Sequence, residues 1–464
     1  MKFRVLVAVS TLALTLGIAG TGAAQAQSIA QALAAAYDHA PDLQSALLSA
    51  KSSAEDIVRA ESAKRPTIGA SLGGNYNWAV GPGAVGPGGT NPTGAFTGSS
   101  TFSAGLSYNQ TIFDNFATEA QIEAARAGAE AAEYQIRNTE QNVLLDVVQA
   151  YMDVMTGQQL VALRQENLTF FRAQLQSAED RLEVGEGTRI DVAQAEARLA
   201  QGEAGYRAAI SSLEVSQATF QRLVGAAPRN LSGGHDFSRL IPGTLQSAIA
   251  EAETGHPAIL LAKAGIRAAQ AGSDAAQAAF GPNASVSGQV GTSYSTATGT
   301  SSGLSGQLGF QITVPIYAGG ALGAGVRKAN IEQIRSEVDA MGAYDQVRAA
   351  VIAAWSGIQS ADAQITAAQA AVSAGQEVLE GVIQERDLGT RTTLEVLNAQ
   401  AELTTAREGL INASSGKVVA TFSLLAAIGR LTAADLGLPV EVKTAVPYTQ
   451  TVEDVWQELR TVAD

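Results

Sequence analysis

Two stretches of the chain decide its fold: GEGTRIDVAQA at residues 185–195 and GTRTTLEVLNA at residues 389–399. In both, a glycine is followed three residues later by a threonine, and three residues after that by an acidic residue and a valine. The stretches lie 204 positions apart, and the same displacement relates Ile112-Phe113 to Ile316-Tyr317. A repeat that keeps its spacing over half a chain indicates two copies of one structural unit.

Nearer the N-terminus the displacement is 216 positions, because Arg65-Pro66 recurs as Gly281-Pro282 and His39-Ala40-Pro41 recurs as Gly255-His256-Pro257. The first copy therefore contains 12 more residues than the second between these two regions of constant spacing, which we interpret as a longer loop. We divide the mature chain into a first repeat, a linker, a second repeat and a C-terminal tail, at residues 27–225, 226–256, 257–429 and 430–464.

Alternating residues predict two β-strands in each repeat. From Thr67 to Val80, mostly apolar or aromatic residues occupy the even positions, and small or polar residues occupy most of the odd ones. A period of two is typical of a strand with one apolar and one polar face. The same pattern predicts strands over about 66–80, 101–113, 283–296 and 304–317, with a Gly- and Pro-rich loop over 81–100.

Each predicted strand has at least about ten residues, the length that a tilted transmembrane strand needs. Aromatic residues near the strand ends match the girdle expected at a membrane interface: Tyr76, Trp78, Phe102, Tyr294 and Tyr317. A soluble β-sandwich is the alternative, but the flanking helices are too long for that fold.

Long segments without proline predict helices of unusual length. They run from Asp114 to about Val184 and from Ala318 to Leu388, roughly 100 Å each at about 1.5 Å per residue. Each ends at a glycine turn, 185–188 or 389–392, and a return helix of about 37 residues follows. A stripe of apolar residues repeated under the 204 shift indicates coiled-coil-like packing: Val143, Val147, Val148, Tyr151 and Val154, then Val347, Val351, Ile352, Trp355 and Ile358.

Four strands cannot close a barrel, since even small membrane barrels use eight. An open sheet in lipid would leave backbone groups unpaired along its edges. Several chains must therefore contribute strands, and three chains supply twelve. We expect an α+β homotrimer with a 12-stranded transmembrane β-barrel, four strands per chain, continuous with a long α-helical barrel.

The arrangement resembles the TolC family of outer-membrane efflux and secretion channels over essentially the whole mature chain. The resemblance rests on the duplication, on the strand ends Ile112-Phe113-Asp114 and Ile316 to Gly320, and on residues 389–399, which look like the family's second-tip signature. Asn115-Phe116 stands where the family often has glycines, a departure that we expect to change little.

The resemblance implies a place in the bacterial outer membrane, in contact with its lipid, with a helical domain in the periplasm. It also implies an exit duct without a cofactor, which works with a periplasmic adaptor protein and an inner-membrane ABC or proton-driven transporter.

The resemblance further implies a gate at the helical tips. In the family, carboxylates at the position of Glu395 and one turn later form rings that select cations; the later position here is Asn398, so one ring would be uncharged. Asp191 is the first-repeat counterpart of Glu395, and simple capping of the helix N-terminus is its alternative role. Arg391 matches the family arginine that latches neighbouring helix pairs, and Arg386 stands where the latch partner is expected, which implies a different network.

Residues at both tips match the groove in which adaptor hairpins dock in the family: Arg181, Val184, Gly185, Leu388 and Gly389. The glycines are also what a tight helical turn needs. Both roles stay open at this point.

Composition argues against several functions. The formal net charge of −14 argues against nucleic acid as a partner and favours cations. The absence of cysteine excludes disulfides, thiolate metal sites and a lipidation cysteine. His39, His235 and His256 stand apart from any carboxylate or serine pattern, so we expect neither a metal site nor an enzyme.

The first 26 residues predict a secretory signal peptide. Lys2 and Arg4 precede a mostly apolar run over 5–19, and Ala24-Gln25-Ala26 resembles a cleavage site. A retained anchor helix is the alternative. Beyond this segment we expect no run that approaches the roughly 20 apolar residues of a transmembrane helix.

Two uses of such a duct remain open: type I protein secretion with an ABC transporter, or multidrug or metal efflux with a proton-driven pump. The segment from Pro447-Tyr448 to Val455-Trp456 faintly resembles the tails of secretion-branch members, which favours secretion. A structural periplasmic coiled coil would not need the strands, and a diffusion porin would not need helices of roughly 100 Å.

Overall fold

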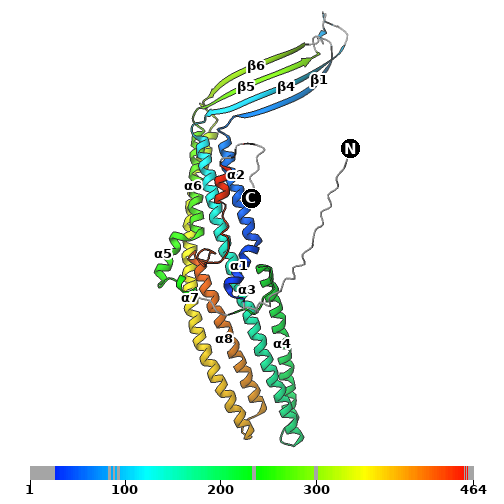
Figure 1. Ribbon diagram of the computed structural model, residues 1–464, viewed down its shortest axis with the longest axis vertical. Helices are drawn as coiled ribbons and strands as arrows, with labels where there is room; N and C mark the ends of the chain where they lie inside the picture. The colour runs from blue at the N-terminus through cyan, green and yellow to red at the C-terminus, as the bar shows by residue number, and fades with distance from the viewer. Residues whose placement is uncertain are drawn as a thin grey trace, which may run out of the picture.

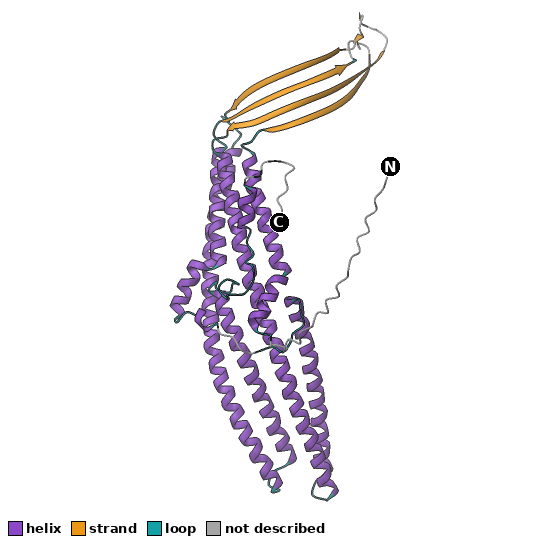
Figure 2. Ribbon diagram, viewed as in Figure 1, coloured by secondary structure: helices purple, strands orange, loops and turns teal. Residues whose placement is uncertain are grey.

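The chain forms an elongated bundle of helices with a sheet at one end (Figures 1 and 2). The predicted signal peptide, residues 1–26, lies outside the residues that the structure describes, as does Trp456. The computed structural model describes residues 27–81, 85–86, 89–90, 95–232, 237–296, 301–453, 455 and 457.

The helices form two matched sets. The first set is α1 (Ile29–His39), α2 (Pro41–Ser62), α3 (Ala117–Glu183) and α4 (Arg189–Val224); the second is α5 (Leu245–Gly255), α6 (Pro257–Ala278), α7 (Ala321–Asp387) and α8 (Thr393–Ala427). Both long helices, α3 and α7, have 67 residues, and both α2 and α6 have 22, which confirms the predicted duplication. A short 3₁₀ helix (Ser238–Leu240) precedes α5, and α9 (Val446–Val452) lies in the tail.

The short helices α1 and α5 were not predicted. The predicted linker, 226–256, contains all of α5. Both helices begin at a capping box, Ser28 with Gln31 and Thr244 with Ser247, in which each side chain bonds to the other residue's backbone.

The main sheet has the strand order β1-β4-β5-β6, and every neighbouring pair is antiparallel. Its strands are β1 (Thr67–Gly81), β4 (Ala95–Phe113), β5 (Asn283–Ser295) and β6 (Ser301–Thr313), and a small hairpin joins β2 (Val85–Gly86) to β3 (Gly89–Thr90). Two predicted boundaries were wrong. β4 begins at Ala95, inside the predicted loop, and β6 ends at Thr313 because Pro315 lacks an amide hydrogen and restricts Val314.

The register brings even-numbered residues opposite one another across all four strands. Leu106 faces Ala70 on β1 and Val290 on β5, and Leu308 of β6 faces Gly288. The apolar residues therefore share one face of the sheet, and they are exposed there, Leu72 by 88% and Leu308 by 82%. The opposite face carries mainly serine, glycine, asparagine and glutamine, so the predicted alternation is confirmed.

The main core lies at the level of α1, where α3, α8 and the tail meet. Its largest fully buried side chains are Tyr37, Tyr151, Phe220 and Phe422. The Tyr151 hydroxyl lies 2.7 Å from the carbonyl oxygens of both Gln27 and Ser232. The predicted stripe is buried throughout in α3, whereas in α7 Val347 and Val351 are buried and Ile352 is 41% exposed.

The tail packs back along the bundle. Glu140, which is buried on α3, accepts a hydrogen bond from the Ala433 amide at 2.6 Å. Burial raises the pKa of Glu140. Near α9, Tyr448 donates to Glu55 of α2 at 2.7 Å. These contacts fix the tail against the first repeat.

One helix, α8, is long and apolar enough to cross a membrane by length and composition alone. Its most apolar window has a mean hydropathy of 1.3, and 28% of that window is buried. The expectation that no such run exists beyond the signal peptide was therefore wrong. α8 packs against α7 and contributes Phe422, Leu424 and Leu425 to the main core.

Asn115 and Phe116 adopt the left-handed backbone conformation that glycines adopt in the second repeat. Both residues have positive φ angles, 55° and 68°, like Gly319 and Gly320 at the equivalent positions. A positive φ is unusual for a bulky residue and costs about 1–3 kcal/mol. The side chains of Asn115 and Phe116 nevertheless make contacts that glycine cannot make.

Candidate functional site

The two turns opposite the sheet have the same backbone. Gly185 has a φ of 83° and Gly389 a φ of 79°. The amides of Glu186 and Thr390, which are equivalent positions, bond back to the carbonyls of Arg181 and Glu385 at 2.8 and 2.9 Å. Such left-handed caps close the last turn of a helix and favour glycine. The first half of each signature therefore has a structural role.

The second half of each signature caps the return helix. The Asp191 carboxylate accepts from the Thr188 amide at 3.1 Å, and the Glu395 carboxylate accepts from the Thr392 amide at 2.8 Å. In return, each threonine hydroxyl accepts from the amide of its acidic partner. The capping role that the sequence left open for Asp191 is therefore present at both tips.

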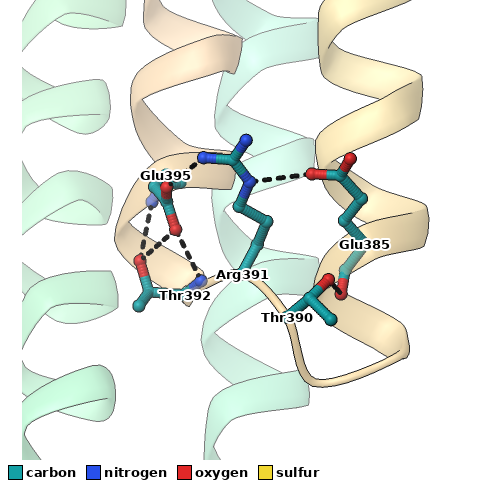
Figure 3. A network of polar contacts seen from close by, with 5 residues as sticks. All are labelled: Glu385, Thr390, Arg391, Thr392 and Glu395. Carbon is teal, nitrogen blue, oxygen red and sulfur yellow. Dashed lines mark hydrogen bonds and ion pairs between the residues drawn. The ribbon is translucent and has the colours of Figure 1, made fainter.

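The second tip adds a charge network (Figure 3). Arg391 reaches Glu385 and Glu395 through different nitrogen atoms, each at 2.7 Å. The Thr392 amide, followed by Arg391, lowers the pKa of Glu395 to about 2, and both carboxylates raise the pKa of Arg391. Arg391 thus joins α7 to α8 within its own hairpin.

Arg386 makes the connection to the neighbouring hairpin. It is 8% exposed, and its guanidinium donates to the Gln174 side chain of α3 at 2.6 Å. Two further bonds, of 2.7 and 3.0 Å, reach Asp387. Arg386 thus links the two hairpins of the chain through Gln174, a partner that the sequence did not identify.

Four more polar contacts join the hairpin α3–α4 to the hairpin α7–α8. Together with Arg386–Gln174 they form what we term the cross-hairpin ladder: Gln400–Asn167 at 3.1 Å, Arg407–Glu166 at 2.9 Å, Arg164–Glu408 at 2.6 Å and Arg198–Asn398 at 2.7 Å. Asn398, which the resemblance places in a ring, accepts from Arg198 of α4. Sequence alone missed most of the ladder because it does not tell which faces of distant helices meet.

Contacts within the second hairpin are both polar and apolar: Arg407 bonds to Gln376 at 3.1 Å, and Lys417 pairs with Asp362 at 2.7 Å. Leu379 of α7 packs with Val396, Ala399 and Leu403 of α8, and Phe170 of α3 adds one contact from across the interface. A net hydrogen bond contributes only about 0.5–1.5 kcal/mol, since water can replace the partner. Each contact of the cross-hairpin ladder therefore stabilises the interface between the hairpins only modestly.

Exposed apolar side chains lie at both tips. Val184 is 71% exposed and Leu388 is 81% exposed, while Arg181 is half-buried. Ile190, which the sequence analysis did not single out, adds a third such side chain at 68%. Exposed apolar residues beside a rigid turn form a surface that a partner can cover.

The histidines support the backbone. His256 caps α6, since its ring nitrogen Nδ1 accepts from the Ala258 amide at 3.1 Å, and burial lowers its pKa. The ring of His39 packs over Gly225. His235 lies outside the described residues, and among the described ones no group of three His, Asp or Glu side chains is placed to hold a metal ion.

Comparison with known proteins identifies the family. The profile of the outer membrane efflux proteins matches residues 32–226 and 248–430, which are the two repeats. The chain belongs to this family. The sheet accordingly lies in the outer membrane and the helical bundle in the periplasm, and the expected resemblance is confirmed.

Individual relatives agree with this assignment. The chain is 36% identical to the outer membrane efflux protein BepC of Brucella suis over 443 residues, which cover 95% of this chain and 93% of BepC. It is 25% identical to TolC of Vibrio cholerae, over 90% of this chain and 94% of TolC. The Campylobacter jejuni CmeC outer membrane channel shares the fold, with a TM-score of 0.75, 17% identity and coverage of 92% and 88%.

Proposed function

We propose that the protein is the exit duct of a tripartite export system that spans the cell envelope. In this proposal three copies form the duct, a periplasmic adaptor docks at the helical tips, and an inner-membrane transporter delivers the cargo. The observation that carries the proposal is one chain that joins a sheet, whose described strands leave two edges unpaired, to a pair of 67-residue helices that end in tight turns.

Unpaired strand edges and exposed apolar side chains support the homotrimer. β1 and β6 each have one unpaired edge within the described sheet. A stripe on α7 is also exposed: Ile331 by 63%, Ile334 by 59%, Val338 by 59% and Met341 by 67%. Burial of such a side chain contributes about 1.5–3 kcal/mol, so association of copies removes a large unfavourable surface from water.

The polar face of the sheet supports passage of varied cargo. The strands β1, β4, β5 and β6 contain no charged residue, and their odd positions carry mainly small hydroxyl, amide and glycine groups. A channel lined in this way presents no fixed charge to a passing molecule. Selection then falls to the tips, where Glu395 keeps its negative charge.

The cross-hairpin ladder supports a gate. Opening requires the two hairpins of each chain to separate, and the ladder is where polar contacts would be exchanged for water. An adaptor that binds the exposed Val184 and Leu388 more tightly in the open state would shift the equilibrium toward opening. Asp191 and Glu395 would then lie around the widened entrance.

For the cargo we propose protein, exported by an ABC transporter in a type I system. This rests on the tail, whose resemblance to secretion-branch members includes Pro447-Tyr448, and Tyr448 contacts Glu55. Small-molecule efflux is the second candidate, favoured by BepC, whose name is that of an efflux protein. No catalytic step is proposed.

The test is deletion of the gene in its host, with secreted proteins and sensitivity to toxic compounds scored together. Loss of one or a few proteins from the medium, with unchanged sensitivity, is the result expected for type I secretion. Hypersensitivity with an intact secretome would support efflux instead, and the absence of both defects would count against a duct. Complementation with the wild-type gene is the control.

A further inference from the structure

The junction between sheet and helices differs between the repeats in its side chains, not in its backbone. In the first repeat Asn115 and Phe116 turn the chain from β4 into α3. In the second repeat, Gly319 and Gly320 make the equivalent turn into α7, with φ angles of 62° and 84°.

The first junction is filled from the side of the long helix. The Asn115 amide donates to the carbonyl of Ala278, at the end of α6, at 3.1 Å. A Cβ atom on Gly281 would lie only 2.1–2.5 Å from the Asn115 side chain, so Gly281 has to be glycine. The ring of Phe116 meets Phe113 edge to face, with centroids 5.8 Å apart.

The second junction is open. No other atom of the described chain lies within 4 Å of a Cβ position built on Gly319 or Gly320. Tyr317, the counterpart of Phe113, is 88% exposed, since glycine replaces the aromatic partner. α3 packs against both α2 and α6, whereas α7 packs against α6. The side of α7 that corresponds to the α6 side of α3 is therefore available.

We propose that Arg65 of a second copy of this chain fills the open junction, with its stem over Gly319-Gly320 and its guanidinium on the ring of Tyr317. The inference rests on the proposed homotrimer. When β1 of the next copy pairs with β6, the antiparallel order of the sheet continues and α2 of that copy lies beside α7, as α6 lies beside α3.

The duplication places the two side chains on opposite sides of the joint. Arg65 corresponds to Gly281, and Gly319 corresponds to Asn115. Within one chain, the large side chain is Asn115, which precedes α3, and the glycine is Gly281, which follows α6. Between chains, the large side chain would be Arg65, which follows α2, and the glycine would be Gly319, which precedes α7. The two junctions are thus complementary versions of one contact.

An arginine suits this place chemically. It follows the C-terminus of α2, where a cation is favoured, and it lies 3.6 Å from Glu61 on the same helix. Its planar guanidinium stacks on aromatic faces, and Tyr317 offers one. The contact would lie at the periplasmic end of the sheet.

The same correspondence between the two repeats explains the exposed stripe on α7. Ile331 corresponds to Ala127, which is buried, and Ile334 corresponds to Glu130, which pairs with Arg267 of α6. On the facing helix, Leu48 is 54% exposed, whereas its counterpart on α6 is a fully buried alanine. Leu48 of the next copy therefore meets the stripe at the height of Ile334.

Cross-linking tests the contact, since the chain has no cysteine of its own. Arg65→Cys with Tyr317→Cys is treated with a short bismaleimide in detergent-purified protein and analysed on a denaturing gel; covalent trimers are expected. Leu48→Cys with Ile334→Cys is the matched pair that reports copy-to-copy contact away from the junction. Native mass spectrometry of the protein without engineered cysteines measures whether the trimer forms, independently of both cysteine pairs.

The outcomes distinguish the proposed Arg65 contact from the proposed homotrimer. Linkage of the Leu48 pair without the Arg65 pair would leave the trimer standing and overturn the junction. A monomeric mass would overturn both.

A swap of side chains provides the second test. Gly319→Asn puts bulk on both sides of the joint, so the temperature at which the trimer dissociates should fall. Adding Arg65→Gly recreates the arrangement of the first repeat and should recover most of that loss. Asparagine tolerates the left-handed φ of Gly319, so misfolding of the turn is not the expected cause. A double variant no more stable than Gly319→Asn alone would contradict the proposal.

Discussion

The third residue of the turn is Gly187 at the first tip and Arg391 at the second tip. Both turns use a left-handed glycine and both return helices use a capping box. Only the second hairpin adds the network of Glu385, Arg391 and Glu395, and only it sends Arg386 to the opposite hairpin, where the first repeat has Leu182. The shared residues therefore set the shape of a tip, and the unshared ones place charges on the second tip and tie it to the opposite hairpin.

The largest effect is expected from Arg386→Leu, which makes the second hairpin resemble the first. The change removes the bond to Gln174 and leaves that amide without its partner at the hairpin interface. The closed state should lose more than the open state, so single-channel conductance in lipid bilayers should rise several-fold.

The control for this prediction is Gln174→Leu, which removes the same bond from the other side. A double-mutant cycle should show that the two changes together add little to either alone, since they act on one contact. Conductance unchanged in Arg386→Leu would mean that the ladder does not hold the gate.

Equal backbone geometry predicts equal damage when each turn glycine is changed. Gly185→Ala and Gly389→Ala should each destabilise the local turn by about 1–2 kcal/mol, the cost of a left-handed conformation for a residue with a Cβ atom. Hydrogen exchange of the turn amides should accelerate about tenfold for each 1.4 kcal/mol. Gly128→Ala is the control: this glycine lies inside α3 with open space around it, so its exchange should slow or stay the same.

If the two substitutions destabilise their turns by different amounts, the charge network contributes to the stability of the second turn. In that case Gly389→Ala should be the milder change, because the bonds from Arg391 to Glu385 and Glu395 still hold the turn.

Patterns local in sequence were predictable, and contacts between distant segments were not. Alternation from Thr67 onward gave the strands, and the glycine turns at Gly185 and Gly389 gave the tips, because each depends on neighbouring residues. The partner of Arg386 required knowing that this end of α7 lies within side-chain reach of α3, which no periodicity records. The left-handed backbone conformation of Phe116 was not predicted, because bulky residues rarely adopt a positive φ. Its contact with Phe113 became visible only in the structure.

Arg391→Gly gives the second tip the residue of the first and should change selectivity more than conductance. Without the guanidinium at 2.7 Å, the Glu395 carboxylate keeps its charge but loses its counter-ion, so the preference for cations should increase modestly. The reversal potential in a salt gradient measures this. Glu395→Gln should lower the preference, and Glu385→Gln, which leaves Arg391 on Glu395, should not raise it. A preference that falls in Arg391→Gly would contradict this prediction and would show that Arg391 is needed to hold the Glu395 carboxylate at the entrance.

The smallest effect is expected from pH. The pKa of Glu395 is lowered from its ordinary 4.5 to about 2, so its charge and the cap it provides are fully present above about 4.5 and are lost only as the pH falls toward about 2. The share of the reversal potential that depends on Glu395, measured against Glu395→Gln, should therefore stay constant between about pH 8 and about pH 4. In Arg391→Gly one cause of the lowered pKa is absent, and the loss should begin at a higher pH than in the wild type. A wild-type share that already declines at about pH 6 would show that the network of the second tip does not hold this carboxylate in the open duct, and would remove the electrostatic difference between the two tips.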